Sequence, residues 1–530
     1  MTFWHDQQSN TMVWDTPHAA EILPLFEHAT HLRNGYLAAP VSLYNCQVAQ
    51  YCKLPTVPVV DQDYDWPIKA PWRPREHQKV MTEFMVQNPR CFNLSDMGTM
   101  KTLAALWAAD YLMERNPGMR CLIVTPISTM QRTWGDAITA HFLGRRTYAI
   151  LHGDPKKRLR ELNKDVDFYI INYEGVNVGA KIQRVGNRRK VELGGMSKEL
   201  ASRKDIAICC IDEASAYRDG TTKRHLIARH VLAHKPYFWL MTGTPTSNGP
   251  LDAHGIARLV NNAFGESYQS YRKRIMYPIS QFKEVPRVGA EAEAHKLLQP
   301  SIRYEMRECT DVPPCTEQMR DVELSDEQNK YYRELKRYLT LQLERGVVNA
   351  VNEAALRLKL IQISCGAVYD GEHRTHRLDC APRLRELRAV IEEARRKVII
   401  FTPLTSIVRL LYEDLKEYSR AMVNGEVPIK VRNEIFQKFQ QDNDPQLIIA
   451  DPAAMSHSLD LFAASVVCWY GAPDRTELYL QANRRIDRPG QVVPTTIVQL
   501  ASTAVEREIY KRISTNTSMQ GAILKMVQDQ

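Results

Sequence analysis

Short apolar runs that alternate with amphipathic stretches limit the fold of this chain more than any other feature. In the first half, four such runs are typical of buried parallel strands: CLIVTP (121–126), DFYIINY (167–173), IAICCIDE (206–213) and YFWLMTG (237–243). The stretch 102–112 has a helical pattern, because Leu103, Leu106 and Trp107 recur at spacings of three and four. Strands that alternate with helices predict an α/β lobe around a parallel sheet.

The second half repeats this pattern after a helical stretch at about 320–365. Its strand candidates are KVIIFTP (397–403), QLIIADP (446–452), SVVCWYG (465–471) and TTIVQLA (495–501). A chain of 530 residues is too long for one ordinary core. Two α/β halves joined by a helical segment therefore predict two lobes with a cleft between them.

The chain divides into four segments on this basis. Pro67, Pro71 and Pro74 forbid a continuous helix and mark a linker near residue 70. We expect an N-terminal accessory module over 1–70, a first lobe over 71–305, a helical linker or brace over 306–385 and a second lobe over 386–530.

Composition excludes several classes of protein. The eleven cysteines include no C-x-x-C pair, so we expect neither a zinc site nor a disulfide framework. The chain has no long apolar run and no signal sequence at its start, so we expect no membrane span and a location in a reducing cytoplasm. A net charge of +9 is compatible with a nucleic-acid partner.

The segment SDMGTMKT (95–102) has the features of a phosphate-binding loop. It follows an apolar run and opens a helical stretch, which is the context such a loop requires. Lys101 would bind the β- and γ-phosphates of ATP, and Thr102 would bind Mg²⁺. Taken alone, the segment also fits a helix N-cap followed by a surface lysine. The loop residues whose backbone would surround the nucleotide are Asp96, Met97, Gly98, Thr99, Met100, Lys101 and Thr102.

A pair of adjacent carboxylates follows the apolar run IAICC. Burying two carboxylates at a strand end is costly unless they bind a metal or water. Asp212 would hold Mg²⁺, and Glu213 would orient the attacking water. In isolation, an acidic N-cap of the next helix explains the pair as well.

Two further segments fit the same chemistry. Thr242, Thr244 and Thr246 follow the run YFWL, and their hydroxyls could hydrogen-bond the acidic pair, although such a segment alone is often a plain turn. Arg485 and Arg488 are three residues apart, so we expect them on one helical face, from which they would stabilise charge on the γ-phosphate. A solvated basic helix face is the simpler alternative. The order of the four segments, each at the end of a predicted strand or on a late helix, argues against coincidence.

In this order the segments resemble the Swi/Snf branch of the second helicase superfamily, from about residue 73 to residue 515. Gln78 stands in the position of the adenine-reading glutamine, and IDEAS stands where the family has DEAH. Further matching segments are LIVTPISTMQRTW (122–134), LMTGTPTSN (240–248), the brace at 307–332, LRLKLIQISCG (356–366), VIIFTP (398–403), SHSLDLFAASVVCWYGAP (456–473) and QANRRIDRPGQ (481–491).

The resemblance implies two RecA-like lobes and an ATP-dependent, nucleic-acid-stimulated motor that tracks duplex DNA as a monomer. It implies catalytic roles for Lys101, Glu213, Arg485 and Arg488. The chain carries no obvious accessory module beyond residues 1–70, which indicates a compact phage or bacterial member in the bacterial cytoplasm. Within 1–70 there is a faint resemblance to the recognition module of annealing helicases.

The sequence departs from the family at three motifs, and two other functions stay open. Met100 replaces a glycine, Ser215 replaces the histidine of DEAH, and Ser456 and Ser458 replace glycines of motif V, which segment 456–473 resembles. A glycine is dispensable at position 100 if that residue has helical dihedral angles, so we expect an active ATPase. The alternatives are an RNA- or polymerase-directed ATPase, or a degenerate ATP-gated DNA-binding module.

The most basic local stretch is KIQRVGNRRK (181–190), between two predicted strands. Its Arg184, Arg188, Arg189 and Lys190 are candidates for contacts to phosphate groups of nucleic acid. A solvated loop is the alternative.

Overall fold

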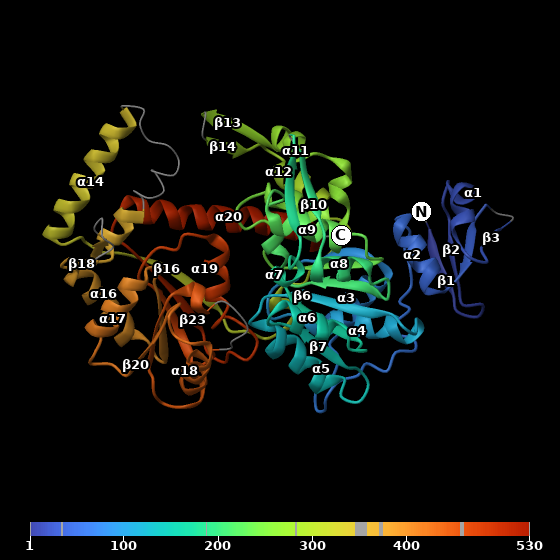
Figure 1. The fold of residues 1–530 in the computed structure, drawn as a ribbon, viewed down its shortest axis with the longest axis horizontal. Coiled ribbons are helices and arrows are strands. Elements are labelled where there is room, and N and C mark those ends of the chain that lie inside the picture. The colour runs from blue at the N-terminus through green and yellow to red at the C-terminus, as the bar shows by residue number, and fades with distance from the viewer. Residues whose placement is uncertain are drawn as a thin grey trace.

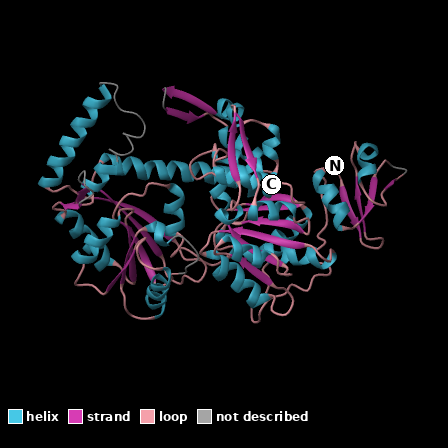
Figure 2. Cartoon of the chain, in the orientation of Figure 1, coloured by secondary structure: helices cyan, strands magenta, loops and turns pink. Residues whose placement is uncertain are grey.

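Two parallel sheets, each flanked by helices, and a small antiparallel sheet make up this computed structural model (Figures 1 and 2). The structure describes residues 2–32, 35–186, 188–280, 283–344, 358–369, 375–455 and 461–528. The predicted α/β fold with two RecA-like lobes is confirmed. In the described residues, no helix is both long enough and apolar enough to cross a membrane.

The N-terminal module has its own antiparallel sheet in the order β1-β2-β4-β3. Trp14 and Leu37 of this sheet are fully buried in a hydrophobic cluster that also includes Trp107 of the first lobe. The module therefore shares its core with the first lobe. Its elements are β1 (Phe3–Asp6), β2 (Thr11–Trp14), α1 (Ala19–Ile22), η1 (Leu23–Leu25), β3 (Thr30–His31), β4 (Leu37–Pro40) and α2 (Leu43–Tyr51).

The sheet of the first lobe has seven parallel strands in the order β15-β5-β12-β11-β6-β8-β7. Four of them coincide with the apolar runs of the sequence, because a strand covered by helices on both faces is apolar along its whole length. The strands are β5 (Arg90–Asn93), β6 (Arg120–Thr125), β7 (Tyr148–Leu151), β8 (Phe168–Asn172), β11 (Ile206–Ile211), β12 (Tyr237–Met241) and β15 (Ser301–Ile302).

Helices cover both faces of this sheet, and two hairpins project from the lobe (Figure 1). The helices are α3 (Glu76–Gln87), α4 (Lys101–Arg115), η2 (Met130–Gly135), α5 (Asp136–His141), α6 (Pro155–Leu162), α7 (Tyr173–Val176), α8 (Gly195–Ser202), η3 (Ala214–Tyr217), α9 (Lys223–Val231), α10 (Asp252–Val260), η4 (Asn262–Gly265), α11 (Tyr268–Ile275) and α12 (Ala290–Leu297). The hairpins are β9 (Lys181–Val185) with β10 (Arg188–Glu192), and β13 (Met276–Ser280) with β14 (Lys283–Pro286).

The second lobe is built on six parallel strands in the order β16-β23-β22-β19-β21-β20. They are β16 (Cys315–Asp321), β19 (Lys397–Phe401), β20 (Arg420–Val423), β21 (Leu447–Ala450), β22 (Ala464–Trp469) and β23 (Thr495–Ala501). The remaining elements are α13 (Met306–Cys309), α14 (Asp326–Glu344), the hairpin β17 (Ala367–Tyr369) and β18 (Thr375–Arg377), α16 (Ala381–Glu393), α17 (Thr405–Asp414), α18 (Ile429–Gln441), η5 (Pro452–Met455), α19 (Thr476–Asn483) and α20 (Ala504–Gln528).

The last helix, α20, connects the two lobes (red in Figure 1). Near its start, Ile509 and Ile513 are buried in the core of the second lobe. Near its end, Ile523, Leu524 and Val527 are buried in a core cluster of the first lobe. One continuous helix therefore contributes apolar side chains to both cores.

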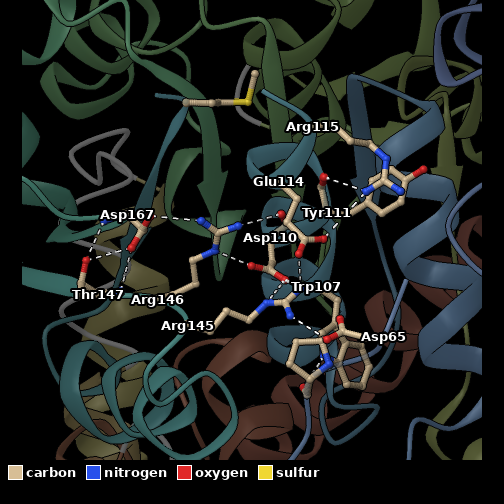
Figure 3. Close-up of polar contacts among 12 residues, drawn as sticks. Asp65, Trp107, Asp110, Tyr111, Glu114, Arg115, Arg145, Arg146, Thr147 and Asp167 are labelled. Atoms are coloured by element: carbon tan, nitrogen blue, oxygen red, sulfur yellow. Dashed lines mark hydrogen bonds and ion pairs between the residues drawn. The ribbon is translucent and has the colours of Figure 1, made fainter. Parts of the chain in front are cut away.

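A buried carboxylate ties the segment after α2 to the first lobe (Figure 3). Asp110 of α4 has a fully buried side chain, and it pairs with Arg145 at 2.8 Å and with Arg146. The Tyr64 hydroxyl donates to Asp110 at 2.7 Å, and Arg145 also pairs with Asp65 at 2.7 Å. The network therefore joins α4 to the segment before it and to the turn before β7.

Asp110→Ala is expected to lower the free energy of unfolding by about 3 kcal/mol, because it leaves two arginines without their shared buried partner. Chemical denaturation measures this change. Asp165→Ala is the matched control: that side chain is 89% exposed and also pairs with an arginine, Arg120. It should cost less than about 1 kcal/mol. Equal effects of the two substitutions would contradict the structural role of Asp110.

Candidate functional site

The predicted site residues of the first lobe lie at one edge of its sheet. The carboxyl ends of parallel strands meet at the same edge, which is where open α/β sheets bind ligands. The phosphate loop follows β5, Asp212 and Glu213 follow β11, and Thr242 follows β12. Gly243 lies against the phosphate loop, since a Cβ on it would be 3.3 Å from the backbone nitrogen of Met97.

Lys101 is the first residue of α4, and its amino group lies over the phosphate loop. The Nζ atom donates to the carbonyl oxygens of Ser95 at 2.6 Å and Asp96 at 2.9 Å. Burial lowers the pKa of Lys101, whereas the charges of Glu213 and Asp212 act in the opposite direction. The lysine is thus placed beside both carboxylates.

Met100 does not have the right-handed helical dihedral angles that would make a glycine dispensable at this position. Met100 has φ +60° and ψ +36°, in the left-handed region, just before α4 begins. Gly98 has φ +90°, as the turn of the loop requires. Two residues of this loop therefore have left-handed backbone conformations. Glycine adopts this conformation without steric cost, whereas the Cβ of Met100 makes it unfavourable by about 1–2 kcal/mol.

Met100→Gly is expected to keep ATP turnover and to change mainly the apparent affinity for ATP. Glycine relieves the left-handed strain but increases the entropy of the unfolded chain, and the two effects nearly cancel in stability. Steady-state kinetics at several ATP concentrations measures the change. Inactive wild-type protein that regains turnover only as Met100→Gly would contradict this expectation.

Asp212 is held in a fixed orientation by donors from other elements. The indole Nε1 of Trp134 donates to Asp212 Oδ2 at 3.0 Å, and the hydroxyl of Thr125 donates to the same atom at 3.2 Å. The Tyr173 hydroxyl donates to the backbone carbonyl of Asp212 at 2.7 Å. Burial raises the pKa of Asp212, while the hydrogen bond from Trp134 opposes the shift.

Glu213 adopts an unusual backbone conformation for a non-glycine residue, with φ +49° and ψ +52°. Such strain is concentrated at functional positions in proteins. Its Oε2 atom is buried and has no hydrogen-bond partner among the described residues. Burial and then the charge of Asp212 raise the pKa of Glu213 to about 7, against the opposing charge of Lys101. The carboxylate is therefore poised to accept a hydrogen bond.

The hydroxyls after β12 do not bond the acidic pair, contrary to the prediction. Thr242 accepts from the backbone nitrogen of Thr244 at 3.1 Å. The hydroxyls of Thr244 and Thr246 are buried without a partner in the described part of the chain. Thr125, at the end of β6, provides the hydroxyl that reaches Asp212 instead.

Gln78 lies in the first turn of α3 and is almost completely buried. Its Oε1 accepts from the backbone nitrogen of Arg75 at 3.0 Å, which caps the helix. Its Nε2 is buried without a partner among the described residues. One donor of the amide is therefore available to a ligand.

The arginines of the last motif do not lie on a helical face as predicted. Helix α19 ends at Asn483, and Arg485 and Arg488 lie in the turns that follow it. Arg485 is nevertheless buried, and its charge lowers the pKa of Glu213. The structure therefore brings Arg485 of the second lobe close to Glu213 of the first.

The turn that carries these arginines rests on the phosphate loop. A Cβ on Gly98 would be 2.8 Å from Pro489 Cδ, so only glycine allows this approach. Arg484 lies 3.6 Å from Asp96 across the same interface. The two lobes thus meet at the site predicted for the β- and γ-phosphates.

A second contact joins the acidic motif to α19. The Ser215 hydroxyl donates to Glu477 at 2.5 Å, and Arg218 pairs with Glu477 at 2.6 Å. Ser215 is the residue that stands in place of the histidine of DEAH. Glu477 could not be predicted from local sequence patterns, because its partners lie 262 and 259 positions earlier.

Several residues of the site were not predicted from sequence. Trp134, Thr125 and Tyr173 orient Asp212, and the first two lie in the family-like segment 122–134. Ser456 and Ser458 of motif V lie outside the described residues.

Comparison with known families agrees with this geometry. The model of the SNF2-related domain matches residues 76–365, and that of the helicase conserved C-terminal domain matches residues 382–490. The first covers the phosphate loop and the acidic pair, and the second covers Arg485 and Arg488.

Individual relatives are distant. Protein p41 of Acyrthosiphon pisum secondary endosymbiont phage 1 is 23% identical over 73% of this chain and 82% of its own length. The DNA repair and recombination protein RAD54-like of Danio rerio is 21% identical over 86% of this chain and 68% of its own length. The Sulfolobus solfataricus SWI2/SNF2 ATPase core in complex with dsDNA is 19% identical, with 87% of this chain and 94% of that chain covered and a TM-score of 0.40.

The family models together cover both lobes, and the first alone matches more than half of the chain. The resemblance inferred from the ordered motifs is confirmed. The chain therefore belongs to the SNF2-related family and is a helicase-like ATPase.

Proposed function

We propose that the chain is a duplex-DNA translocase or remodeller that hydrolyses ATP at the interface of its two lobes. The observation that carries this proposal is the approach of the second lobe to the site: the charge of Arg485 acts on Glu213, and Pro489 packs against Gly98 of the phosphate loop. A motor needs such a shared site because hydrolysis can then change the contact between lobes. The RAD54-like relative, named as a DNA repair and recombination protein, supports DNA as the track.

The residues fit ATP and Mg²⁺. The unpartnered Nε2 of Gln78 is a donor suited to a base, and the amino group of Lys101 is suited to phosphate oxygens. Thr102 and Asp212 offer the oxygen ligands that Mg²⁺ prefers. When bound, the ion would neutralise charge on the phosphates.

The protein side chains would bind the phosphates, position the attacking water and stabilise the transition state. Lys101 would exchange its carbonyl partners for phosphate oxygens, and Glu213 would accept a hydrogen bond from the attacking water. Arg485 and Arg488 would stabilise the negative charge that develops on the transferred group. Movement of the second lobe would assemble or separate these groups. We further propose that one chain suffices, since it supplies both halves of the site.

Comparison of ATP turnover with duplex DNA, single-stranded DNA, forked DNA and RNA tests the proposal. We expect duplex DNA to stimulate turnover most. Stronger stimulation by RNA would favour the RNA- or polymerase-directed ATPase. An absence of turnover with every nucleic acid would favour the degenerate, ATP-gated binding module.

The hairpin of β9 and β10 is proposed to contact the phosphate backbone of the DNA. Arg184 lies directly opposite Arg189, and like charges in this position destabilise a hairpin unless an anion compensates them. Arg189 donates to the carbonyl of Thr221 at 2.6 Å, so Arg184 and Lys190 are the better candidates for DNA contacts. The side chain of Arg188 lies outside the described residues.

Replacing Lys181, Arg184 and Lys190 by glutamine is expected to weaken DNA binding and to flatten its salt dependence. Each lost phosphate contact should reduce the slope of log K against log salt by about one unit. Fluorescence anisotropy over a salt series measures the slope. Lys198→Gln on α8, an exposed position of the same lobe, is the control, and an unchanged slope in the triple variant would exclude the hairpin from the interface.

A further inference from the structure

A large groove lies between the N-terminal module, the first lobe and the end of α20. Its volume is about 2020 Å³, and none of the phosphate-loop residues 95–102 lines it. One wall comes from the end of α2, and the opposite elements include η4 and the edge strand β15. The groove is therefore a second concave site, which adjoins the phosphate loop through Arg303 and Tyr304 but does not include it.

The described residues that line this groove include six lysines and arginines and one carboxylate, Glu308, so the groove is positively charged. Arg229 donates to the side-chain oxygen of Asn262 at 3.0 Å, and neither Arg229 nor Arg258 forms an ion pair in the described part of the chain. Burial and then the neighbouring charge of Arg229 lower the pKa of Arg258. Two adjacent cations without acidic partners favour an anionic ligand.

Two exposed aromatic side chains line the same groove. Tyr51, the last residue of α2, is 85% exposed, and Phe264 of η4 is 65% exposed. Phe264 ends a run of three non-glycine residues with positive φ, after Asn262 and Ala263. The chain thus adopts a strained turn that leaves an aromatic ring exposed in the groove that Arg229 and Arg258 also line.

We propose that this groove binds a single strand of nucleic acid. Phosphate groups would contact Arg229 and Arg258, and bases would stack on Tyr51 and Phe264. Cations interleaved with exposed aromatic rings are the combination that single-strand binding sites use, because every base has a face that stacks. An acidic peptide would use the arginines but would leave the two rings without a matching partner.

The inference rests on the proposed function in one respect, since the strand would belong to the same DNA on which the motor acts. A single-stranded tail next to the duplex would then be held outside the ATP site, against the N-terminal module. This gives the module a role in substrate choice.

Binding of fluorescently labelled dT20 tests the groove directly. Tyr51→Ala/Phe264→Ala and Arg229→Gln/Arg258→Gln should each weaken binding by about 10-fold or more, as expected for the loss of two stacked bases or two phosphate contacts. The controls are Tyr44→Ala, an exposed ring on α2 outside the groove, and Lys198→Gln, which should bind as the wild-type protein does. Unchanged binding in both double variants overturns the proposal.

A photo-crosslinking experiment with 5-bromouracil in the same oligonucleotide provides a second readout on the folded wild-type protein. Crosslinked peptides should contain Tyr51 or Phe264, whereas crosslinks confined to other segments would overturn the proposal. Displacement of dT20 by hexaglutamate at equal concentration would also overturn it, in favour of an acidic protein segment.

The experiments distinguish a failure of the groove proposal from a failure of the proposed duplex-DNA motor. Duplex-stimulated ATP turnover should stay at the wild-type level in the aromatic double variant. If duplex DNA fails to stimulate the wild-type protein while dT20 binding still depends on the groove, the duplex track is wrong and the groove stands.

Discussion

Glu213→Gln is expected to bind ATP normally and to lose turnover by about 10²- to 10⁴-fold. Glutamine preserves the size of the side chain but cannot accept a proton or hold the attacking water as a carboxylate does. The buried, unpartnered Oε2 atom of Glu213 is the acceptor that this substitution removes. Lys101→Ala should instead abolish productive ATP binding, since the loop loses the cation beside the phosphates.

Two measurements separate these variants: ATP turnover with saturating duplex DNA, and equilibrium binding of a fluorescent ATP analogue. Glu199→Gln on α8 makes the same chemical change at an exposed position and should match the wild-type protein in both. Normal turnover in Glu213→Gln or in Lys101→Ala would remove that residue from the catalytic set.

Arg488→Ala is expected to lower the turnover number by about 10³- to 10⁵-fold, with little change in ATP affinity. An arginine that completes the site from the second lobe acts on the charge of the transition state more than on bound ATP. Arg485→Ala should behave in the same way, because Arg485 is buried and its charge reaches Glu213.

Arg488→Lys is the informative control for this prediction. Lysine keeps the charge but loses the planar, bidentate geometry of the guanidinium group, so activity should be restored only in part. A variant that changes the affinity for ATP alone would assign the arginine to binding and not to catalysis.

The fold was predictable from sequence where strands are long and fully buried. The runs before Asp212 and before Thr242 are continuous apolar segments, and both are central strands of the first sheet. The N-terminal sheet was not predicted, because its strands have only two or four residues and carry too little periodicity. The division of the chain at residues 70, 305 and 385 stays a prediction.

The site was predictable where one short segment contains a complete chemical signal. The loop with Lys101 and the pair Asp212 and Glu213 have this property. Backbone conformation was not predictable: Met100 is left-handed and Arg485 lies beyond the end of its helix, and neither feature has a signature in the local pattern of residue types.

Contacts between residues that are far apart in the chain could not be predicted from the sequence either. Glu477 of the second lobe binds Ser215 and Arg218 of the first, and Ser215 is the residue that replaces the histidine of DEAH. These partners are 262 and 259 positions apart, so no local pattern in the sequence links them.

Displacement of a third strand from a DNA triplex tests the central claim most directly, because a motor that tracks duplex DNA removes the third strand without separating the duplex. We predict ATP-dependent displacement by the wild-type protein, none by Glu213→Gln, and no unwinding of the underlying duplex. ATP turnover on duplex DNA without displacement of the third strand would contradict the account.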